Sequence, residues 1–261
     1  MLKGYLDLGA KSDPGDEIVC VGSVVFKPVR YKQFIRPWER MLKEWGASAF
    51  HATDFYVGAE QFKRDTPEKE RLFRADSKRI PRMIGETIRH VEMVSFRPEE
   101  FNRTASPEWK ATFGTSIHSQ AVQLTLIANG WWADTKCPSE RFAYFMEAGD
   151  PDEGTVIEAA LQMKRDAATQ KVVRISSFTA TDKGTARGLE AADFVAWHWN
   201  KYYMDKIRNG KEDEPRKDFA AFVGASKEKI QHIFLTGDNL SYFFSVVPKQ
   251  VLKGKTHATS I

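Results

Sequence analysis

The chain has 261 residues, of which 42% are hydrophobic and 12% aromatic, and it carries 39 Lys and Arg against 35 Asp and Glu. No Pro/Gly/Ser-rich linker divides it, so we expect one domain over residues 1–261 with a substantial core. The first residues lack the apolar stretch of a signal peptide, and no apolar run is long enough to span a bilayer. We therefore expect a cytoplasmic protein with no membrane partner.

The first half of the chain predicts a hairpin of strands followed by helices. Two apolar stretches flank a Pro-Gly turn, and apolar residues then recur at helical spacing. We expect residues 28–88 to form a helical insertion after the second strand. The expected elements are a strand over 2–8, a strand over 17–26, a helix over 30–45, an irregular segment over 46–65 and a helix over 67–88.

The second half alternates strands with helices, a pattern that favours crossover connections and a largely parallel sheet. We expect residues 209–261 to be a C-terminal extension, with a short helix over 226–235 and an apolar stretch over 242–247. The other expected elements are a strand over 89–96, a helix over 106–130, a strand over 141–147, a helix over 152–169, a strand over 171–178 and a helix over 185–208.

With the insertion set aside, the element order is β-β-β-α-β-α-β-α. An antiparallel start followed by right-handed crossovers is the order of the ribonuclease-H-like fold. In that fold the first and fourth strands are neighbours in the middle of the sheet. We therefore expect an α/β fold in which a mixed five-stranded ribonuclease-H-like sheet is flanked by helices.

Three acidic residues lie in apolar surroundings in this scheme. Asp7 is in the first strand, Glu147 is at the end of the fourth strand, and Asp193 is in the most apolar part of the last long helix. Each acid alone is more often a cap or a salt-bridge partner. Together, on neighbouring central strands and a helix packed on them, they would repel each other unless a cation lay between them. Hard oxygen ligands suit Mg²⁺ or Mn²⁺, which can activate water and stabilise a phosphodiester under attack.

Three short motifs resemble a known family. The segments Tyr5-x-Asp7-x-Gly9, Phe50-His51-x-x-Asp54 and Gly188 to Ala196 resemble the bacterial domain of unknown function family 3800, which is similar to ribonuclease-H-like proteins. The resemblance covers residues 5 to about 200, and it implies Asp7, Glu147 and Asp193 as the metal ligands.

The chain departs from the family pattern in two of these motifs. Leu8 replaces the second acid of the opening motif, Tyr-x-Asp-Glu-Ser-Gly, whose serine is also absent. Glu190 replaces the glutamine of the helix motif, Leu-Gln-x-Ala-Asp. Glu190 would either supply the lost negative charge or form a surface ion pair. The loss of the acid at position 8 leaves open a weakened or inactive site.

Several other residues are candidate helpers. His51 lies in the irregular segment, where it would act as a general base, an extra ligand or a phosphate contact, or would merely bond to backbone. Lys183 precedes the last helix and would either neutralise a phosphate or, as we slightly favour, be an exposed turn lysine. The candidate substrate contacts are Asp54, Asp150, Lys183 and Glu190.

We therefore expect a Mg²⁺- or Mn²⁺-dependent phosphodiester hydrolase, nuclease-like and acting on nucleic acid, with Asp7, Glu147, Asp193 and His51 as catalytic residues. The net charge of +4 is compatible with that partner without indicating it. The alternatives are a catalytically silent binding or assembly module of a mobile-element or defence system, and a hydrolase of a small phosphate ester. The sequence leaves homo-oligomerisation open. The motifs of serine hydrolases, P-loop and Rossmann proteins and zinc sites are absent from the sequence.

Overall fold

A computed structural model describes residues 1–9, 18–150, 152–209, 216–226 and 229–235 of the chain. Within these ranges the strands form one six-stranded mixed sheet in the order β5-β4-β1-β2-β3-β6. β1 pairs antiparallel with β2, and β2 with β3, whereas β1–β4, β4–β5 and β3–β6 are parallel pairs. The strands are β1 (Leu2–Gly9), β2 (Val19–Phe26), β3 (His90–Phe96), β4 (Phe142–Glu147), β5 (Ile175–Thr181) and β6 (Ile230–Leu235).

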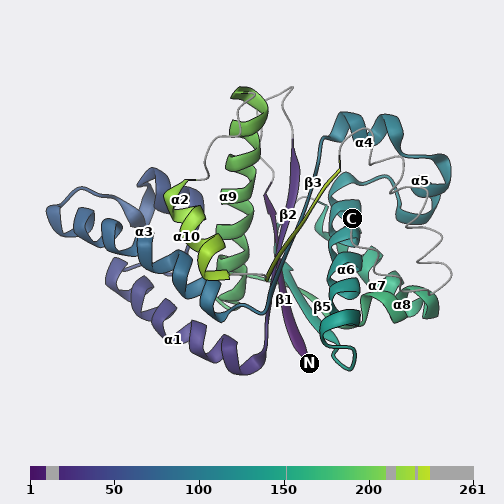
Figure 1. Cartoon of the computed structure of the whole chain (residues 1–261), viewed down its shortest axis with the longest axis horizontal. Helices are drawn as coiled ribbons and strands as arrows, with labels where there is room; N and C mark the ends of the chain where they lie inside the picture. Colours follow the sequence, from purple (N-terminus) through teal and green to yellow (C-terminus); the bar gives the residue numbers. More distant parts are fainter. Residues whose placement is uncertain (10–17, 151, 210–215, 227–228, 236–261) are drawn as a thin grey trace.

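Helices cover both faces of this sheet (Figure 1). The helices on one side are α1 (Pro28–Trp45), α2 (Ala52–Val57), α3 (Pro67–Thr87), α9 (Gly188–Asn209) and α10 (Lys217–Ser226), with the short 3-10 helix η1 (Glu60–Phe62). The helices on the other side are α4 (Pro98–Thr104), α5 (Pro107–Phe113), α6 (Ile117–Lys136), α7 (Glu153–Arg165) and α8 (Ala167–Val173).

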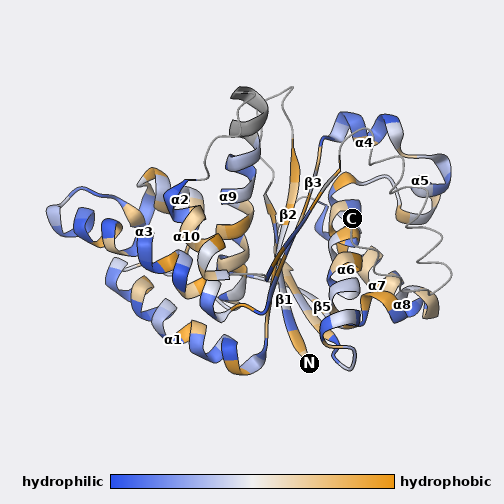
Figure 2. Cartoon of the chain, viewed as in Figure 1, coloured by the Kyte–Doolittle hydropathy of each residue, from blue (hydrophilic) through white to orange (hydrophobic). Residues whose placement is uncertain are grey.

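The sheet separates two apolar clusters, because side chains of a strand point alternately to its two faces. In β1, Tyr5 belongs to the cluster under α1 and α9, whereas Leu6 belongs to the cluster under α6. Figure 2 shows hydrophobic residues on the strands and hydrophilic residues along the outer turns of α3 and α4. This alternation assigns each residue of β1 to one of two separate environments.

Local signals in the sequence account for several helix ends. Thr66 accepts a hydrogen bond from the Lys69 N–H at the start of α3, and Pro67 follows at the first helical position. Gly114, at φ +81°, separates α5 from α6, since a left-handed backbone favours glycine. The single helix expected over 106–130 is therefore two helices.

Other expectations about the elements are wrong. The segment 46–65 is not irregular throughout, because it contains α2 and η1. Residues 171–173 end α8, and β5 begins only at Ile175. The helix expected over 152–169 is divided between α7 and α8 at Asp166, whose side chain caps α8.

The sheet has six strands, not five, because residues 230–235 form β6 where we expected a helix. β6 pairs in parallel with β3 and extends that edge of the sheet. Tertiary pairing has overridden a weak local preference here. The turn of the expected hairpin, residues 10–17, and the apolar stretch over 242–247 lie outside the described residues.

The α/β class and the mixed sheet flanked by helices are confirmed. The neighbouring positions of β1 and β4 are also as predicted, with Tyr5 opposite Phe145 and Leu6 opposite Met146. None of the helices in the described ranges combines the length and the apolar character needed to cross a lipid bilayer.

Candidate active site

Three parallel strands end at the same edge of the sheet and bring polar side chains there. Asp7 lies near the end of β1, Glu147 is the last residue of β4, and Lys183 follows the end of β5 by two residues. The carboxyl ends of parallel strands are a usual location for ligand sites in α/β proteins. Topology alone therefore places these three residues close together.

Helix α9 contributes a fourth side chain, Asp193, because it packs unusually close to the sheet. A Cβ atom on Gly22 of β2 would lie 3.0 Å from the Cβ of Ala196 and 3.2 Å from the carbonyl oxygen of Ala192. A Cβ atom on Gly188 would lie 2.4 Å from the ring of Tyr5. A side chain at Gly188 would force the Tyr5 ring to shift, and one at Gly22 would be crowded by α9, so the two glycines permit the approach that brings Asp193 to the level of Asp7.

The side chains of these elements meet at the ammonium group of Lys183. Its Nζ atom is 2.8 Å from Oε2 of Glu147, 3.1 Å from Oδ2 of Asp193 and 3.5 Å from Oδ1 of Asp7. We call Asp7, Glu147 and Asp193 the carboxylate cluster. Its three acids come from three different elements and surround one position, which a cation fills.

Burial governs the protonation of the cluster. Loss of solvation, followed by repulsion from Asp193, raises the pKa of Asp7 well above its usual range, and Lys183 opposes this shift. Burial likewise raises the pKa of Asp193 against the effect of Lys183. Burial by itself would lower the pKa of Lys183, but Asp7, Asp193 and Glu147 outweigh it and raise that pKa. The single ammonium therefore compensates the negative charge only in part.

Asp150 adds a further acid to this edge. Burial, and then the charge of Glu147, raises the pKa of Asp150 to about 7. Its Oδ2 atom is buried and has no hydrogen-bond partner among the described residues. A buried carboxylate oxygen without a donor is costly and indicates a missing partner. Asp150 therefore presents a fourth carboxylate oxygen beside the carboxylate cluster.

His51 lies at the open side of the cluster, immediately before α2. Its side chain is 46% exposed, and its Nδ1 atom is 3.4 Å from Lys183 Nζ and 3.9 Å from Asp193 Oδ2. The next residue, Ala52, donates its backbone N–H to Asp193 at 3.1 Å. The start of α2 thus positions both His51 and the carboxylate of Asp193.

Asp54 is not part of this group. It lies in the first turn of α2, and its side chain has no hydrogen bond or ion pair with another residue in the part of the chain that the structure describes. Its backbone carbonyl accepts the N–H groups of Gly58 and Ala59 at the end of the helix.

The interpretation of Lys183 as an exposed turn lysine is wrong. Its side chain is only 6% exposed because three acids and His51 surround its end. The misplaced strand explains the error. With β5 expected to end at residue 178, Lys183 is remote from the sheet edge, whereas β5 in fact runs to Thr181.

Glu190 lies away from the carboxylate cluster in a polar site of its own. It accepts hydrogen bonds from Trp38 Nε1, from the Phe50 N–H at 3.0 Å and from Arg187 Nη1 at 2.8 Å. Its side chain is 0% exposed, so its ion pair with Arg187 is buried and the expectation of a surface ion pair is wrong. Burial raises the pKa of Glu190 to about 7, against the effect of these donors.

Leu8 faces the other side of the sheet. It packs against the apolar cluster under α6, together with Leu6, whereas Asp7 points to Lys183 under α9. An acid at position 8 of this strand would therefore not reach the carboxylate cluster. Leucine at this position leaves the set of converging carboxylates intact.

The donors of the cluster suit a hard divalent cation, since all are carboxylate oxygens. In the part of the chain described here, no group of three or more His, Cys, Asp or Glu side chains is arranged to hold a metal ion directly. The arrangement fits an ammonium group instead, because the oxygen atoms stand 2.8–3.5 Å from Lys183 Nζ. If Lys183 were displaced from between them, Asp7, Glu147 and Asp193 are the residues that would hold a divalent ion, with the partnerless Asp150 oxygen nearby.

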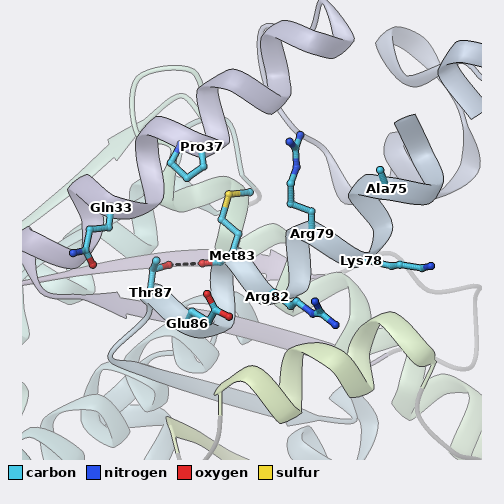
Figure 3. Close-up of a pocket in the computed structure, with 9 residues that line it drawn as sticks. All are labelled: Gln33, Pro37, Ala75, Lys78, Arg79, Arg82, Met83, Glu86 and Thr87. Atoms are coloured by element: carbon cyan, nitrogen blue, oxygen red, sulfur yellow. Dashed lines mark hydrogen bonds between the residues drawn. The ribbon is translucent and has the colours of Figure 1, made fainter. Parts of the chain in front are cut away.

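A separate hollow of about 510 Å³ lies between α1 and α3 (Figure 3). Its basic residues do not converge, because Arg79 pairs with Asp76 and Glu44, while Lys78 and Arg82 extend away from α1. None of the candidate residues from the sequence lines it. The full lining is Gln33, Pro37, Ala75, Lys78, Arg79, Arg82, Met83, Glu86 and Thr87.

The sequence analysis named Gly188 in a motif but assigned no packing role to it or to Gly22, and these two glycines permit the short distance between α9 and the sheet. The one available signal was Gly22 inside a strand pattern, which suggests a close backbone approach.

No protein-family model matches the chain, and no curated protein matches it.

Proposed function

We propose that the protein is a Mg²⁺- or Mn²⁺-dependent phosphodiester hydrolase that acts on nucleic acid in the bacterial cytoplasm. The proposal includes a ribonuclease-H-like fold and the relationship to family 3800 that the three motifs suggest. The observation that carries it is the convergence of Asp7, Glu147 and Asp193 on one cation position at the edge of a mixed sheet.

The fold part of the proposal rests on strand order. An antiparallel β1–β2–β3 start, with β4 and β5 added in parallel beside β1, is the arrangement that a ribonuclease-H-like sheet requires. β6 lies at the opposite edge and leaves the order of these five strands unchanged. The sixth strand is therefore compatible with this fold as an addition.

The roles follow from position and exposure. Asp7, Glu147 and Asp193 would hold the cation, which when bound lowers the pKa of a water and stabilises the charge of the phosphodiester under attack. His51 is the most exposed member of the site and stands beside Asp193, so it can accept a proton from the attacking water. Lys183, at the same edge, can neutralise a phosphate oxygen.

The test is cleavage of single- and double-stranded DNA and RNA with Mg²⁺ or Mn²⁺, comparing wild type with Asp7→Asn and Asp193→Asn. We expect each variant to lose about 1,000-fold in rate, or about 4 kcal/mol in the barrier. Glu190→Gln is the matched control, because it removes a buried carboxylate on the same helix but outside the cluster. Activity that is indifferent to Asp7→Asn and Asp193→Asn would remove the catalytic claim.

A second function has one observation in its favour. The ammonium of Lys183 already fills the position between the acids, so the site is compact without a metal. A catalytically silent binding or assembly module would have such a site. Calorimetric titration with Mn²⁺ separates the two functions, since the module has no affinity for the ion. The same carboxylates would also serve a hydrolase of a small phosphate ester. Including a short phosphate ester as a substrate in the nuclease assay distinguishes this activity from the cleavage of nucleic acid.

A further inference from the structure

Lys183 is held in the carboxylate cluster by its side chain but anchored elsewhere by its backbone. Asp182 accepts hydrogen bonds from the N–H and the hydroxyl of Thr185, both at 2.7 Å, and this fixes the turn that carries Lys183. Between that turn and the ammonium lies a four-carbon stem of rotatable single bonds. The ammonium can therefore change position without any change in the fold.

A metal ion and the ammonium cannot occupy the cluster together. Magnesium holds oxygen ligands at about 2.0–2.1 Å and in near-octahedral geometry. The oxygens of Glu147, Asp193 and Asp7 now surround Lys183 Nζ at 2.8, 3.1 and 3.5 Å. A divalent ion bound by all three would lie where Nζ lies. One cation has to leave for the other to enter.

The charge of the site favours both cations in the same region. Asp7, Glu147, Asp150 and Asp193 are four carboxylates against one ammonium, a formal charge of −3 when all are ionised. A divalent ion reduces this charge to −1 only if Lys183 stays nearby. Electrostatics therefore opposes complete withdrawal of the lysine into solvent.

His51 marks the side to which the ammonium can move. Its Nδ1 is 3.4 Å from Lys183 Nζ, and its ring is 46% exposed, against 14% for Asp193 and 24% for Glu147. Rotation toward His51 takes Nζ from a buried position to the mouth of the site. A phosphate approaching from solvent would meet it there.

We propose that Lys183 is an internal counter-ion that exchanges with the divalent cation. It fills the carboxylate cluster in the metal-free protein and turns toward His51 and the substrate phosphate when the ion enters. This inference rests on the metal site of the proposed function. It adds that the protein's affinity for the ion is reduced by competition from its own lysine.

The first experiment follows the exposure of Lys183 in the unmodified protein. Amine acetylation is measured residue by residue by mass spectrometry, without and with saturating Mn²⁺. We expect modification of Lys183 to become about tenfold faster with the ion. Lys69, in the first turn of α3, is the control, because its Nζ donates to the Trp45 carbonyl oxygen and has no part in the cluster. An unchanged rate for Lys183 on Mn²⁺-loaded protein overturns the exchange.

The second experiment measures Mn²⁺ affinity by calorimetry for wild type, Lys183→Met and the matched control Lys69→Met. Removal of the competing ammonium should tighten binding at least tenfold in Lys183→Met and leave Lys69→Met like wild type. Equal affinities in all three would overturn the exchange and leave the proposed metal site standing. Absence of binding in all three would overturn both. Tight binding by Lys183→Met without nucleic-acid cleavage by wild type would support the exchange and count against the proposed hydrolase alone.

Discussion

Glu190 and Asp193 lie on the same helix, three positions apart, and both are buried carboxylates with raised pKa values. Glu190 is enclosed by donors from Trp38, Phe50 and Arg187. Asp193 instead stands among other acids that share one lysine, next to an exposed histidine.

The comparison shows that burial and a raised pKa do not by themselves distinguish a structural acid from a functional one. The carboxylate of Glu190 has hydrogen-bond donors and no exposure to solvent. Asp193 instead belongs to a group with excess negative charge, which is open to solvent at His51. Uncompensated charge at an accessible edge is the feature that marks a candidate site. Four predictions test this distinction.

The largest effect expected is on stability when Glu190 is removed. Glu190→Ala leaves the buried N–H groups of Trp38 and Phe50 without an acceptor and Arg187 without its ion-pair partner, so we expect a loss of about 3 kcal/mol in the free energy of unfolding. Asp193→Asn removes a repelled charge and should change stability by less than about 1 kcal/mol. Urea denaturation followed by circular dichroism compares the two. Similar losses for both variants would end the distinction between a structural and a functional acid.

The next largest loss of stability is expected where α9 packs closely on the sheet. In Gly188→Ala the new methyl group meets the Tyr5 ring, which is stacked between Tyr31 and Phe145 with centroids at 5.3 and 5.1 Å and cannot move freely. We expect a loss of about 2 kcal/mol and weaker Mn²⁺ binding. Gly154→Ala is the control, since a Cβ there has nothing within 4 Å and Ala favours a helix. Equal stability of both variants would show that the approach of α9 is not tight.

The stability of the protein should also depend on pH through Glu190. The pKa of Glu190 rises from 4.5 to about 7 on folding, so the folded state binds the proton more tightly than the unfolded state. This contribution to stability is therefore full below pH 4.5 and is lost as the pH rises through about 7, with a total of up to about 3 kcal/mol. Denaturation at several pH values should show a shallower decline for Glu190→Gln than for wild type. Identical declines would mean that the donors around Glu190 keep its pKa near the ordinary value.

The smallest effect is expected from Leu8→Glu, which introduces the acid that the resembling motif of family 3800 carries at this position. Because Leu8 packs under α6, on the face opposite Asp7, the new carboxylate should change the Mn²⁺ dissociation constant by less than about twofold, or about 0.4 kcal/mol. Leu8→Gln controls for the lost apolar contact. A large gain in affinity specific to the glutamate would show that position 8 reaches the carboxylate cluster.

Much of the fold could be predicted from periodicity and turn chemistry. The hydrophobic spacing of residues 30–45 and 67–88, with Pro67 at the start of the second stretch, predicts α1 and α3 closely. β6 could not be predicted, since residues 230–235 become a strand only by pairing with β3. The late start of β5 was missed because apolar residues lie on both sides of Arg174, where α8 ends and β5 begins, so periodicity does not locate the boundary.

The candidate site, like the fold, could be predicted from the sequence only in part. The acids Asp7, Glu147 and Asp193 stand out in the sequence because each interrupts an apolar element, and strand order predicts that they meet. The burial of Lys183 among them does not follow from its own neighbours, Thr181-Asp182-Lys183-Gly184, which are typical of an exposed turn.

The sequence by itself determined the α/β class, the neighbouring β1 and β4 strands and the three acids, because these depend on residue type and on the order of elements along the chain. Only the tertiary structure decided which cation lies between the acids and which face each residue uses. The physical reason is that both depend on distances of a few ångströms between segments far apart in sequence. Two glycines set those distances here, where α9 meets β2 at Gly22 and Tyr5 at Gly188.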